Sequence, residues 1–308
     1  MTYIVAIGAY LVLLMIFGLI VAHKKVKTSD DMVTGGHRIP FIVLVGTLLA
    51  TWCGGGGITG SASVVYTGGP WVGLITFAAP PIGIILLYFI AGKVRKSNKV
   101  TVPEIMEARY GKAASIISAL CVMLAYVGVL ATQLKAAADI LVLLCSSSGV
   151  TMSHGMALTI CAVIIAIITV GGGLVSVAYS DAVSALIMIG GFFLAIPFLM
   201  IVAASQGAVL PPEKTTLTGG MSGVELLGYF LPSLALMLGD QNMLQRFASA
   251  KNSDEAKKSN IGMFIGEILV IIAIIAVVTQ AAKLYPSLDT PSNVIFQVAV
   301  DYLPLVFG

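Results

Sequence analysis

Charge is scarce in this 308-residue chain, in which only 10% of the residues are charged and 58% are hydrophobic. The mean hydropathy of +1.02 lies far outside the range of soluble domains, in which about a quarter of the residues carry charge. This composition excludes a soluble enzyme or a soluble binding module. The small net charge of +3 gives no reason to expect a nucleic-acid partner.

Reactive side chains are also few, with four cysteines and three histidines scattered along the chain. None of the cysteines has CxxC or metal-like spacing, so the sequence offers neither a disulfide framework nor a zinc site. It contains no activated nucleophile, no acid–base pair and no phosphate-binding loop. We therefore expect a protein that is not an enzyme and that needs no organic cofactor.

Long apolar runs are what the sequence has in abundance. Stretches of about 20 apolar residues, the length that crosses a bilayer as a helix, recur along the whole chain. They predict an all-α integral membrane protein, with one transmembrane domain over residues 1–308. The predicted spans are 3–22, 41–66, 72–92, 114–145, 153–171, 180–204, 223–240 and 260–283.

Basic residues follow alternate spans. All but three of the 17 lie in the loops after the first, third and seventh spans. The positive-inside rule places these loops in the cytoplasm and the N-terminus outside. We expect a multi-pass protein of the plasma or inner membrane, with the lipid bilayer as its surroundings.

Four consecutive glycines interrupt the second span, where residues 50–60 read ATWCGGGGITG. Each glycine costs a helix about 1 kcal/mol relative to alanine, so the run predicts a break in the helix. Irregular backbone within a membrane is tolerated only where it is buried in protein or lines a polar cavity. Transporters use such breaks to offer carbonyls and amides to an ion and a solute. The alternative is a small-residue face against which another helix packs closely.

The seventh span carries a second irregularity. Pro232 interrupts it, and it ends at Gly239 and Asp240. A proline-broken helix that matches a glycine-broken helix is typical of a binding site near the middle of the membrane.

Four motifs in order resemble the sodium:solute symporter family, which includes sodium-coupled sugar, proline, pantothenate and choline carriers. ATWCGGGGITGSASVVY is similar to the first repeat helix of that family, and KVTVPEIMEARYG to its cytoplasmic connection "tvPe.l..RYG". GGGLVSVAYSDAVS resembles its segment "GGl.av.wTD..Q", and GDQNMLQRFASAKN its segment "Q..vQR..aakn". Within the family, TWCGGGG and GGLVSVAYSD most resemble the branch that contains the choline carriers.

The resemblance implies two inverted repeats of five helices behind one extra leading helix. Span 3–22 is then the extra helix, 41–204 the first inverted repeat, and 223–308 the start of the second. Family members continue beyond the segment that DYLPLVFG resembles. The resemblance therefore predicts an incomplete second repeat, as in a fragment or a truncated reading frame.

The same resemblance implies ion sites. The main sodium site of the family uses two main-chain carbonyls of the broken first helix, which fall on Ala50 and Cys53, together with oxygens from a helix beyond residue 308. Asp181, with Ser180 beside it, matches an acidic residue that in some members helps to form a second cation site. The alternative for this pair is a helix N-cap at the cytoplasmic surface.

The implied substrate positions lie on both broken spans and on the fourth span. Choline-type carriers place aromatic side chains where this sequence has Gly128 and Asp240, which argues against choline. Exposed amides of the glycine run suit a carboxylate, so we expect an amino acid or organic acid first, a cationic solute second and a sugar third. The positions are Trp52, Gly54, Gly55, Gly56, Gly57, Tyr126, Gln133, Ser233, Met237 and Asp240.

Most of the charged residues inside the spans can be explained by pairing with one another, and one has no evident role. Lys135 and Asp139 lie one helical turn apart and neutralise each other. Asp240 either faces the solute or pairs with Arg246 at the cytoplasmic end. Glu267 has no evident partner, and the sequence assigns it no role.

The leading hypothesis is a symporter that binds Na⁺ and a small organic solute and works by alternating access. Two other functions stay open. Some proteins of this family join the transporter body to a C-terminal signalling kinase, which would make the chain part of a membrane sensor. The chain could also be a structural, regulatory or inactive fragment. The sequence makes no prediction of oligomeric state.

Overall fold

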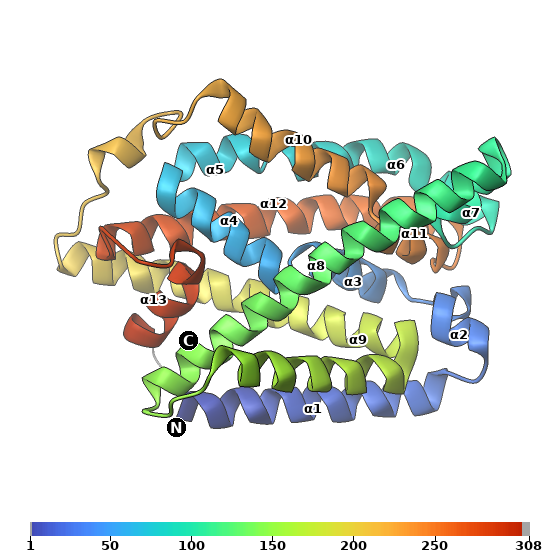
Figure 1. Cartoon of the computed structure of the whole chain (residues 1–308), viewed down its shortest axis with the longest axis horizontal. Helices are drawn as coiled ribbons and strands as arrows, with labels where there is room; N and C mark the ends of the chain where they lie inside the picture. The colour runs from blue at the N-terminus through green and yellow to red at the C-terminus, as the bar shows by residue number, and fades with distance from the viewer. Residues whose placement is uncertain (1, 304–308) are drawn as a thin grey trace.

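A computed structural model describes residues 2–303, except for the side chains of residues 2–4, 29–30, 168 and 170–172. Every regular element in this range is a helix, and most of the long helices run along the long axis of the molecule (Figure 1). Within the described residues, β-structure is limited to one isolated bridge between Ile39 and Ala250. The all-α prediction is therefore confirmed.

The helices follow the predicted spans closely. Six are long and apolar enough to cross a membrane, and α3 with α4 makes a seventh when the two are counted as one bent span. The long elements are α1 (Thr2–Lys25), α3 (Phe41–Trp52), α4 (Gly55–Gly68), α6 (Ala79–Ser97), α8 (Lys112–Ser147), α9 (His154–Ser205), α10 (Gly223–Gly239) and α12 (Ser253–Leu284). The short ones are α2 (Ser29–Thr34), α5 (Pro70–Thr76), α7 (Val102–Tyr110), α11 (Gln241–Ala248) and α13 (Val294–Tyr302).

Helix α9 contains both the fifth and the sixth predicted spans. Its path changes at Gly173, where φ is 56° and only glycine is unstrained. A Cβ at Gly173 would lie 2.8 Å from the backbone oxygen of Met32, so the turn also needs glycine for space. The second limb of α9 begins here, earlier than the predicted start at residue 180.

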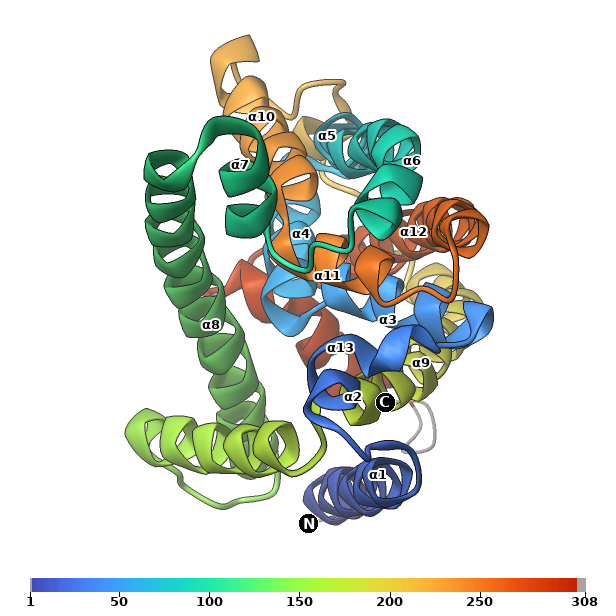
Figure 2. The same cartoon turned by 90° about the vertical axis from the view of Figure 1, so that its right-hand side faces the viewer.

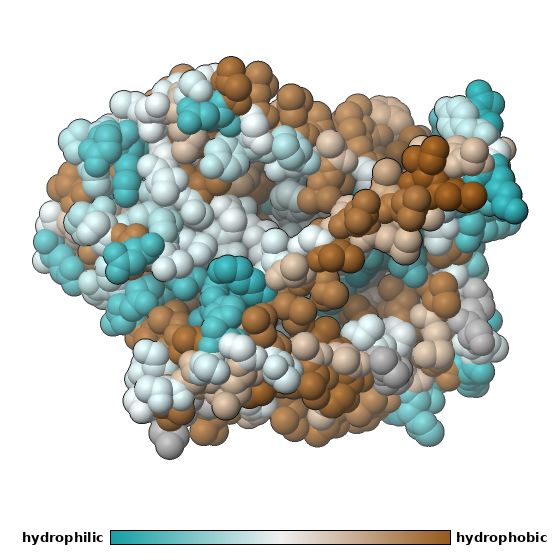
Figure 3. Space-filling model, viewed as in Figure 1, coloured by the Kyte–Doolittle hydropathy of each residue, from teal (hydrophilic) through white to brown (hydrophobic). Residues whose placement is uncertain are grey.

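The buried core surrounds α12. This helix packs against α3, α4, α6 and α9, and its face toward them is almost entirely apolar. Helix α8 lies differently, standing at one side of the molecule with most of its length exposed (Figure 2). Hydrophobic residues run along this exposed helix, whereas hydrophilic residues gather near the two ends of the molecule (Figure 3). Such a surface fits a bilayer around the middle and water at each end.

The three basic loops lie together at the right-hand end of Figure 1. The carbonyl of Ala250, after α11, accepts a hydrogen bond of 2.6 Å from Nε of Arg95, in the last turn of α6. Ala250 also bridges Ile39, and Nδ1 of His37 lies 2.6 Å from the carbonyl of Ala248. One end of the bundle thus holds the loops that the positive-inside rule groups together. The side of the membrane that this end faces stays a prediction.

Candidate functional site

The glycine run breaks a helix, as predicted. Helix α3 ends at Trp52, Cys53 has φ −79° and ψ 35°, and α4 begins at Gly55 at an angle of 55° to α3. The break consists of Cys53 and Gly54 alone, because the helix resumes inside the glycine run. The remaining glycines therefore form the first turn of α4.

This break leaves main-chain groups open. Among the described residues, no hydrogen bond reaches the carbonyls of Ala50 and Cys53, and none comes from the amides of Gly54, Gly55 and Gly57. The last carbonyls and first amides of any helix lack partners within that helix. Here both sets meet at one point, with the positive end of the α4 dipole beside them.

The glycines also let α8 approach the break. The amide of Gly56 donates a hydrogen bond of 2.8 Å to Oε1 of Gln133. A Cβ at Gly54 would lie 2.3 Å from Nε2 of Gln133, and one at Gly56 would lie 3.2 Å from Oγ1 of Thr132. Both interpretations of the glycine run therefore apply, since it breaks one helix and packs against another.

The second break lies at Asp240 and not at Pro232. Helix α10 continues through Pro232 to Gly239, and Asp240 then separates it from α11 with φ −67° and ψ 114°. Oδ1 of Asp240 accepts a hydrogen bond of 3.0 Å from the amide of Met243 and so caps α11. A proline inside a helix removes one hydrogen bond, which bends the helix without ending it. An N-cap carboxylate stabilises a new helix start, which explains the position of the break.

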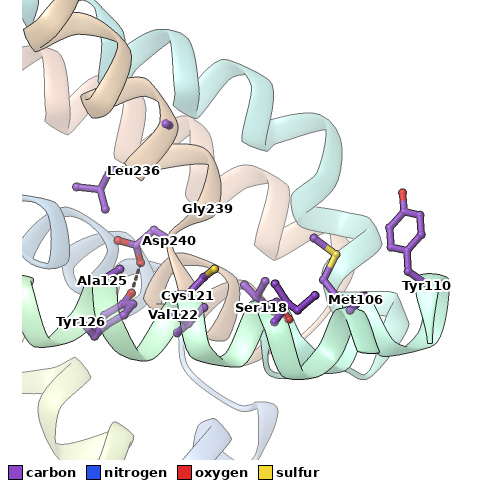
Figure 4. A pocket seen from close by; sticks show the side chains of 14 residues that line it. Met106, Tyr110, Ser118, Cys121, Val122, Ala125, Tyr126, Leu236, Gly239 and Asp240 are labelled. Atoms are coloured by element: carbon purple, nitrogen blue, oxygen red, sulfur yellow. Dashed lines mark hydrogen bonds between the residues drawn. The ribbon is translucent and has the colours of Figure 1, made fainter. Parts of the chain in front are cut away.

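Tyr126 of α8 contacts this second break (Figure 4). Its hydroxyl donates to Oδ1 of Asp240 at 2.9 Å and accepts from the amide of Asn242 at 3.0 Å. Tyr126 and Gln133 are seven residues apart, which places them on one face of α8, about 10 Å apart along the axis. One face of α8 thus bonds to both breaks. We call Cys53–Gly57, Asp240–Asn242, Tyr126 and Gln133 the two-break site.

A groove leads from the basic end of the molecule to the two-break site. It has a volume of about 650 Å³ and lies between α7, α8 and α10. Tyr110 lies at its outer end, and Tyr126 with Asp240 at its inner end (Figure 4). Its other lining residues are mostly apolar, namely Val102, Met106, Ala114, Ile117, Ser118, Cys121, Val122, Ala125, Ala235, Leu236 and Gly239.

Three predicted substrate residues lie outside the two-break site. Met237 is fully buried against α6, where a Cβ at Gly83 would lie 2.6 Å from its Cγ. Ser233 lies one turn earlier on α10, on the same face as Met237, and is half-buried. Trp52 is half-buried at the end of α3, where it packs against the core on both sides. The sequence alone could not place Ser233 and Met237, because the rotation of α10 depends on its packing against α6.

Asp181 belongs to a buried polar cluster. Oγ1 of Thr47 donates to Oδ2 of Asp181 at 2.6 Å, Nε of Arg246 donates to the same Oγ1 at 2.9 Å, and Nη2 of Arg246 lies 3.3 Å from Oδ2. The cluster joins α3, α9 and α11. Two structural alternatives are therefore wrong, because Arg246 pairs with Asp181 and not with Asp240, and because Asp181 lies inside a helix and caps none. Ser180 packs instead against Gly18 of α1.

One family model covers most of the chain. The family model described as "Sodium:solute symporter family" matches residues 32–299. The chain belongs to this family. Residues matched by the model include both breaks, all of α8 and the Asp181 cluster.

The family members that it matches are transporters. The human high affinity choline transporter 1 is 27% identical over 274 residues, which cover 82% of this chain and 46% of that protein. The sodium/sialic acid symporter NanT of Aliivibrio fischeri (strain ATCC 700601 / ES114) is 26% identical over 275 residues, covering 83% and 52%. The chain thus spans about half the length of the curated relatives it matches.

A solved structure shares the fold. It is a Na⁺-coupled sialic acid symporter in a substrate-bound, outward-open state, with a TM-score of 0.80 and 18% sequence identity. The match covers 100% of this chain and 67% of that one. The predicted symporter fold of a multi-pass membrane protein is therefore confirmed, whereas the boundaries of the two repeats stay a prediction.

Further charged residues lie outside the two-break site. The predicted pair of Lys135 and Asp139 forms, with Nζ 2.6 Å from Oδ2. The sequence did not indicate that His154 joins it, with Nε2 2.8 Å from Oδ1 of Asp139. Glu267 is fully buried in α12, and neither of its carboxylate oxygens has a hydrogen-bond partner among the described residues.

Proposed function

We propose that this protein is a sodium-coupled secondary transporter that carries a small organic solute across the plasma membrane by alternating access. One observation carries the proposal, namely the open carbonyls and amides at the break between α3 and α4 in a chain of this family.

The sodium ion binds at the carbonyls of Ala50 and Cys53. Hard cations take oxygen ligands, and these two oxygens already lack hydrogen-bond donors. Cys53 contributes its main chain, so its buried thiol plays no part in binding. Asp181 is the candidate for a second cation site, where an incoming cation would compete with the guanidinium of Arg246 for Oδ2.

The solute carries a carboxylate. The amides of Gly54, Gly55 and Gly57 are unpaired at the positive end of α4, which is an arrangement that binds anions. Asp240 keeps its negative charge, but it lies at the other break, about 10 Å along α8 from the glycine amides, and its Oδ1 accepts hydrogen bonds from Tyr126 and the amide of Met243. An amino acid or organic acid fits this site best, and sialic acid, which the relative NanT transports by name, belongs to the same chemical class.

A cationic solute is the second candidate. Six of the relatives are choline transporters by name, and Oδ2 of Asp240 is free of hydrogen bonds among the described residues. A choline site needs aromatic rings around the ammonium group. The two-break site has Tyr126 and the nearby Trp52, so we rank choline below a carboxylate.

The test is uptake by full-length protein, expressed from its complete gene and reconstituted in liposomes. An inward Na⁺ gradient should drive concentrative uptake of a labelled amino acid, organic acid or sialic acid. Replacing Na⁺ by K⁺, with the membrane potential held equal, should abolish it. Equal uptake without Na⁺ would contradict sodium coupling, and uptake of choline alone would contradict the carboxylate. The variant Cys121→Ala, which lies in the groove away from both breaks, is the matched control.

A further inference from the structure

A second hollow lies at the basic end of the molecule and shares no lining residue with the two-break site. It has a volume of about 290 Å³ and lies between the end of α1, the segment around α2, and α9. Four of its lining residues are basic and one is acidic. The charged and polar lining residues are Lys24, Lys25, Lys27, Asp31, Arg38 and Tyr179.

The positive charge of this hollow is not neutralised from within. Among the described residues, none of the four basic side chains forms an ion pair. The single carboxylate, on Asp31, is engaged locally, because its Oδ2 accepts hydrogen bonds of 3.0 Å from the amides of Lys27 and Thr28. These amides, with help from Arg38, hold the pKa of Asp31 below its usual value. The hollow therefore presents an excess of positive charge to a ligand.

One wall of the hollow is preorganised by α9. Nζ of Lys25 donates a hydrogen bond of 2.5 Å to the hydroxyl of Tyr179 and lies 4.3 Å from the centre of its ring. This cation–π contact fixes the ammonium group at the edge of the hollow. Lys24 lies in the last turn of α1 and Lys27 in the loop that follows it, whereas Arg38 lies beyond α2, so the four charges line one space from different segments.

The part of α1 that precedes the hollow exposes apolar side chains, which suit contact with acyl chains. One to two turns before Lys24, α1 exposes Ile16, Leu19 and Ile20, which are between 43% and 48% accessible. An apolar, exposed stretch of α1 that precedes the basic hollow by one to two turns suits a phospholipid, whose acyl chains begin next to its phosphate. A free phosphate compound would use the hollow but would leave this apolar face without a role.

We propose that this hollow binds the phosphate of an anionic phospholipid from the leaflet that faces the basic end. Lys27 and Arg38 contact the phosphate, Lys25 is held in place by Tyr179, and the acyl chains lie along α1. The bound lipid joins α1 to the second limb of α9. This site is separate from the two-break site and does not depend on which solute the protein carries.

The experiment measures lipid binding to full-length protein in detergent, by native mass spectrometry and by the thermal shift. The probes are phosphatidylglycerol, phosphatidylcholine, and glycerophosphoglycerol, which is the same headgroup without acyl chains. We expect phosphatidylglycerol to bind at least fivefold more strongly than phosphatidylcholine. The double variant Lys27→Gln with Arg38→Gln should lose that preference. The matched control, Lys96→Gln with Lys112→Gln, removes the same charge at the same end of the molecule and should keep it.

Two outcomes overturn the proposal. Equal loss in both double variants would mean that overall charge, and not this hollow, attracts the lipid. Equal binding of glycerophosphoglycerol and phosphatidylglycerol would identify a free phosphate ligand instead of a lipid. If the double variant is not monodisperse, the single variant Lys27→Gln decides, because this exposed side chain has no hydrogen-bond role in the fold.

Discussion

The two helix breaks differ in how the first amides of the following helix are paired. At the first, glycine provides no side chain, and the carbonyls of Ala50 and Cys53 stay open. At the second, Asp240 uses its own carboxylate to cap α11 and binds the hydroxyl of Tyr126 as well. The first break therefore leaves the first amides of α4 open to a ligand, whereas at the second break the amides of Asn242 and Met243 are already paired within the protein.

Both breaks are held by the same neighbours. Gln133 and Tyr126 bond to them from one face of α8, and the cluster of Thr47, Asp181 and Arg246 joins the helices on their other sides. Four variants separate what is shared between the breaks from what is specific to each.

The largest effect is expected for Asp181→Asn. Arg246 is 6% exposed, and removing its partner leaves a buried charge uncompensated, which costs about 3–5 kcal/mol. Because the cluster joins α3 to α11, both breaks should lose stability together. Thermal unfolding in detergent measures the loss. The control Lys135→Gln removes a lysine that is 65% exposed, while His154 still pairs with Asp139, so it should cost less than about 1 kcal/mol. If both variants lowered the thermal stability equally, the cluster of Thr47, Asp181 and Arg246 would not stabilise the protein as proposed.

Gly54→Ala should damage the first break alone. Its Cβ would lie 2.3 Å from Nε2 of Gln133, so the amide must move away and give up its bond to Gly56. We expect sodium-driven uptake to fall by about tenfold, which corresponds to roughly 1.4 kcal/mol. Gly60→Ala is the matched control, because a Cβ there meets nothing within 4 Å. If both variants transport equally, the close packing of α8 on the break is not required.

Tyr126→Phe should damage the second break alone. The variant removes one hydrogen bond to Asp240 and one from the amide of Asn242, at a cost of about 1–2 kcal/mol. Thermal stability should fall while the sodium concentration for half-maximal uptake stays the same. Tyr110→Phe, at the exposed outer end of the groove, is the control for the loss of a hydroxyl. A change in sodium dependence would show that the two breaks are coupled through α8.

Cys53→Ala should have the smallest effect. Only the carbonyl of Cys53 is proposed to bind Na⁺, and the substitution keeps it. We expect the sodium dependence of uptake to change by less than about twofold, because a factor of two is roughly 0.4 kcal/mol. A tenfold loss of apparent sodium affinity would assign the binding to the thiol instead.

Local features of the structure could be predicted from the sequence. The apolar runs predicted the helices, the glycine run predicted the first break, and the spacing of Lys135 and Asp139 predicted their ion pair. Each of these depends on residues that are close together in the chain. The spacing between basic loops likewise predicted which loops lie at one end.

Long-range features could not be predicted in this way. Asp181 and Arg246 are 65 residues apart, and nothing local to either marks the other as its partner. The same holds for Gln133 at Gly56, and for Tyr126 at Asp240. The second break was misplaced because proline is the stronger local signal, whereas the capping carboxylate of Asp240 acts only once α11 has formed. The rotation of α10 that buries Met237 depends on the shape of α6.

The contacts of Ala250 hold several helices together at one end of the bundle. Ala250 precedes α12 and bonds to Arg95 of α6 and to Ile39, which precedes α3. The three helices therefore cannot separate at this end without losing these bonds. Helix α12 has 32 residues and is about 48 Å long. If α12 tilted by about 5° around Ala250, its far end would move by about 4 Å while Ala250 stayed in place. Relative motion among these helices should therefore grow with distance from Ala250 and be greatest near Leu284, at the opposite end of α12.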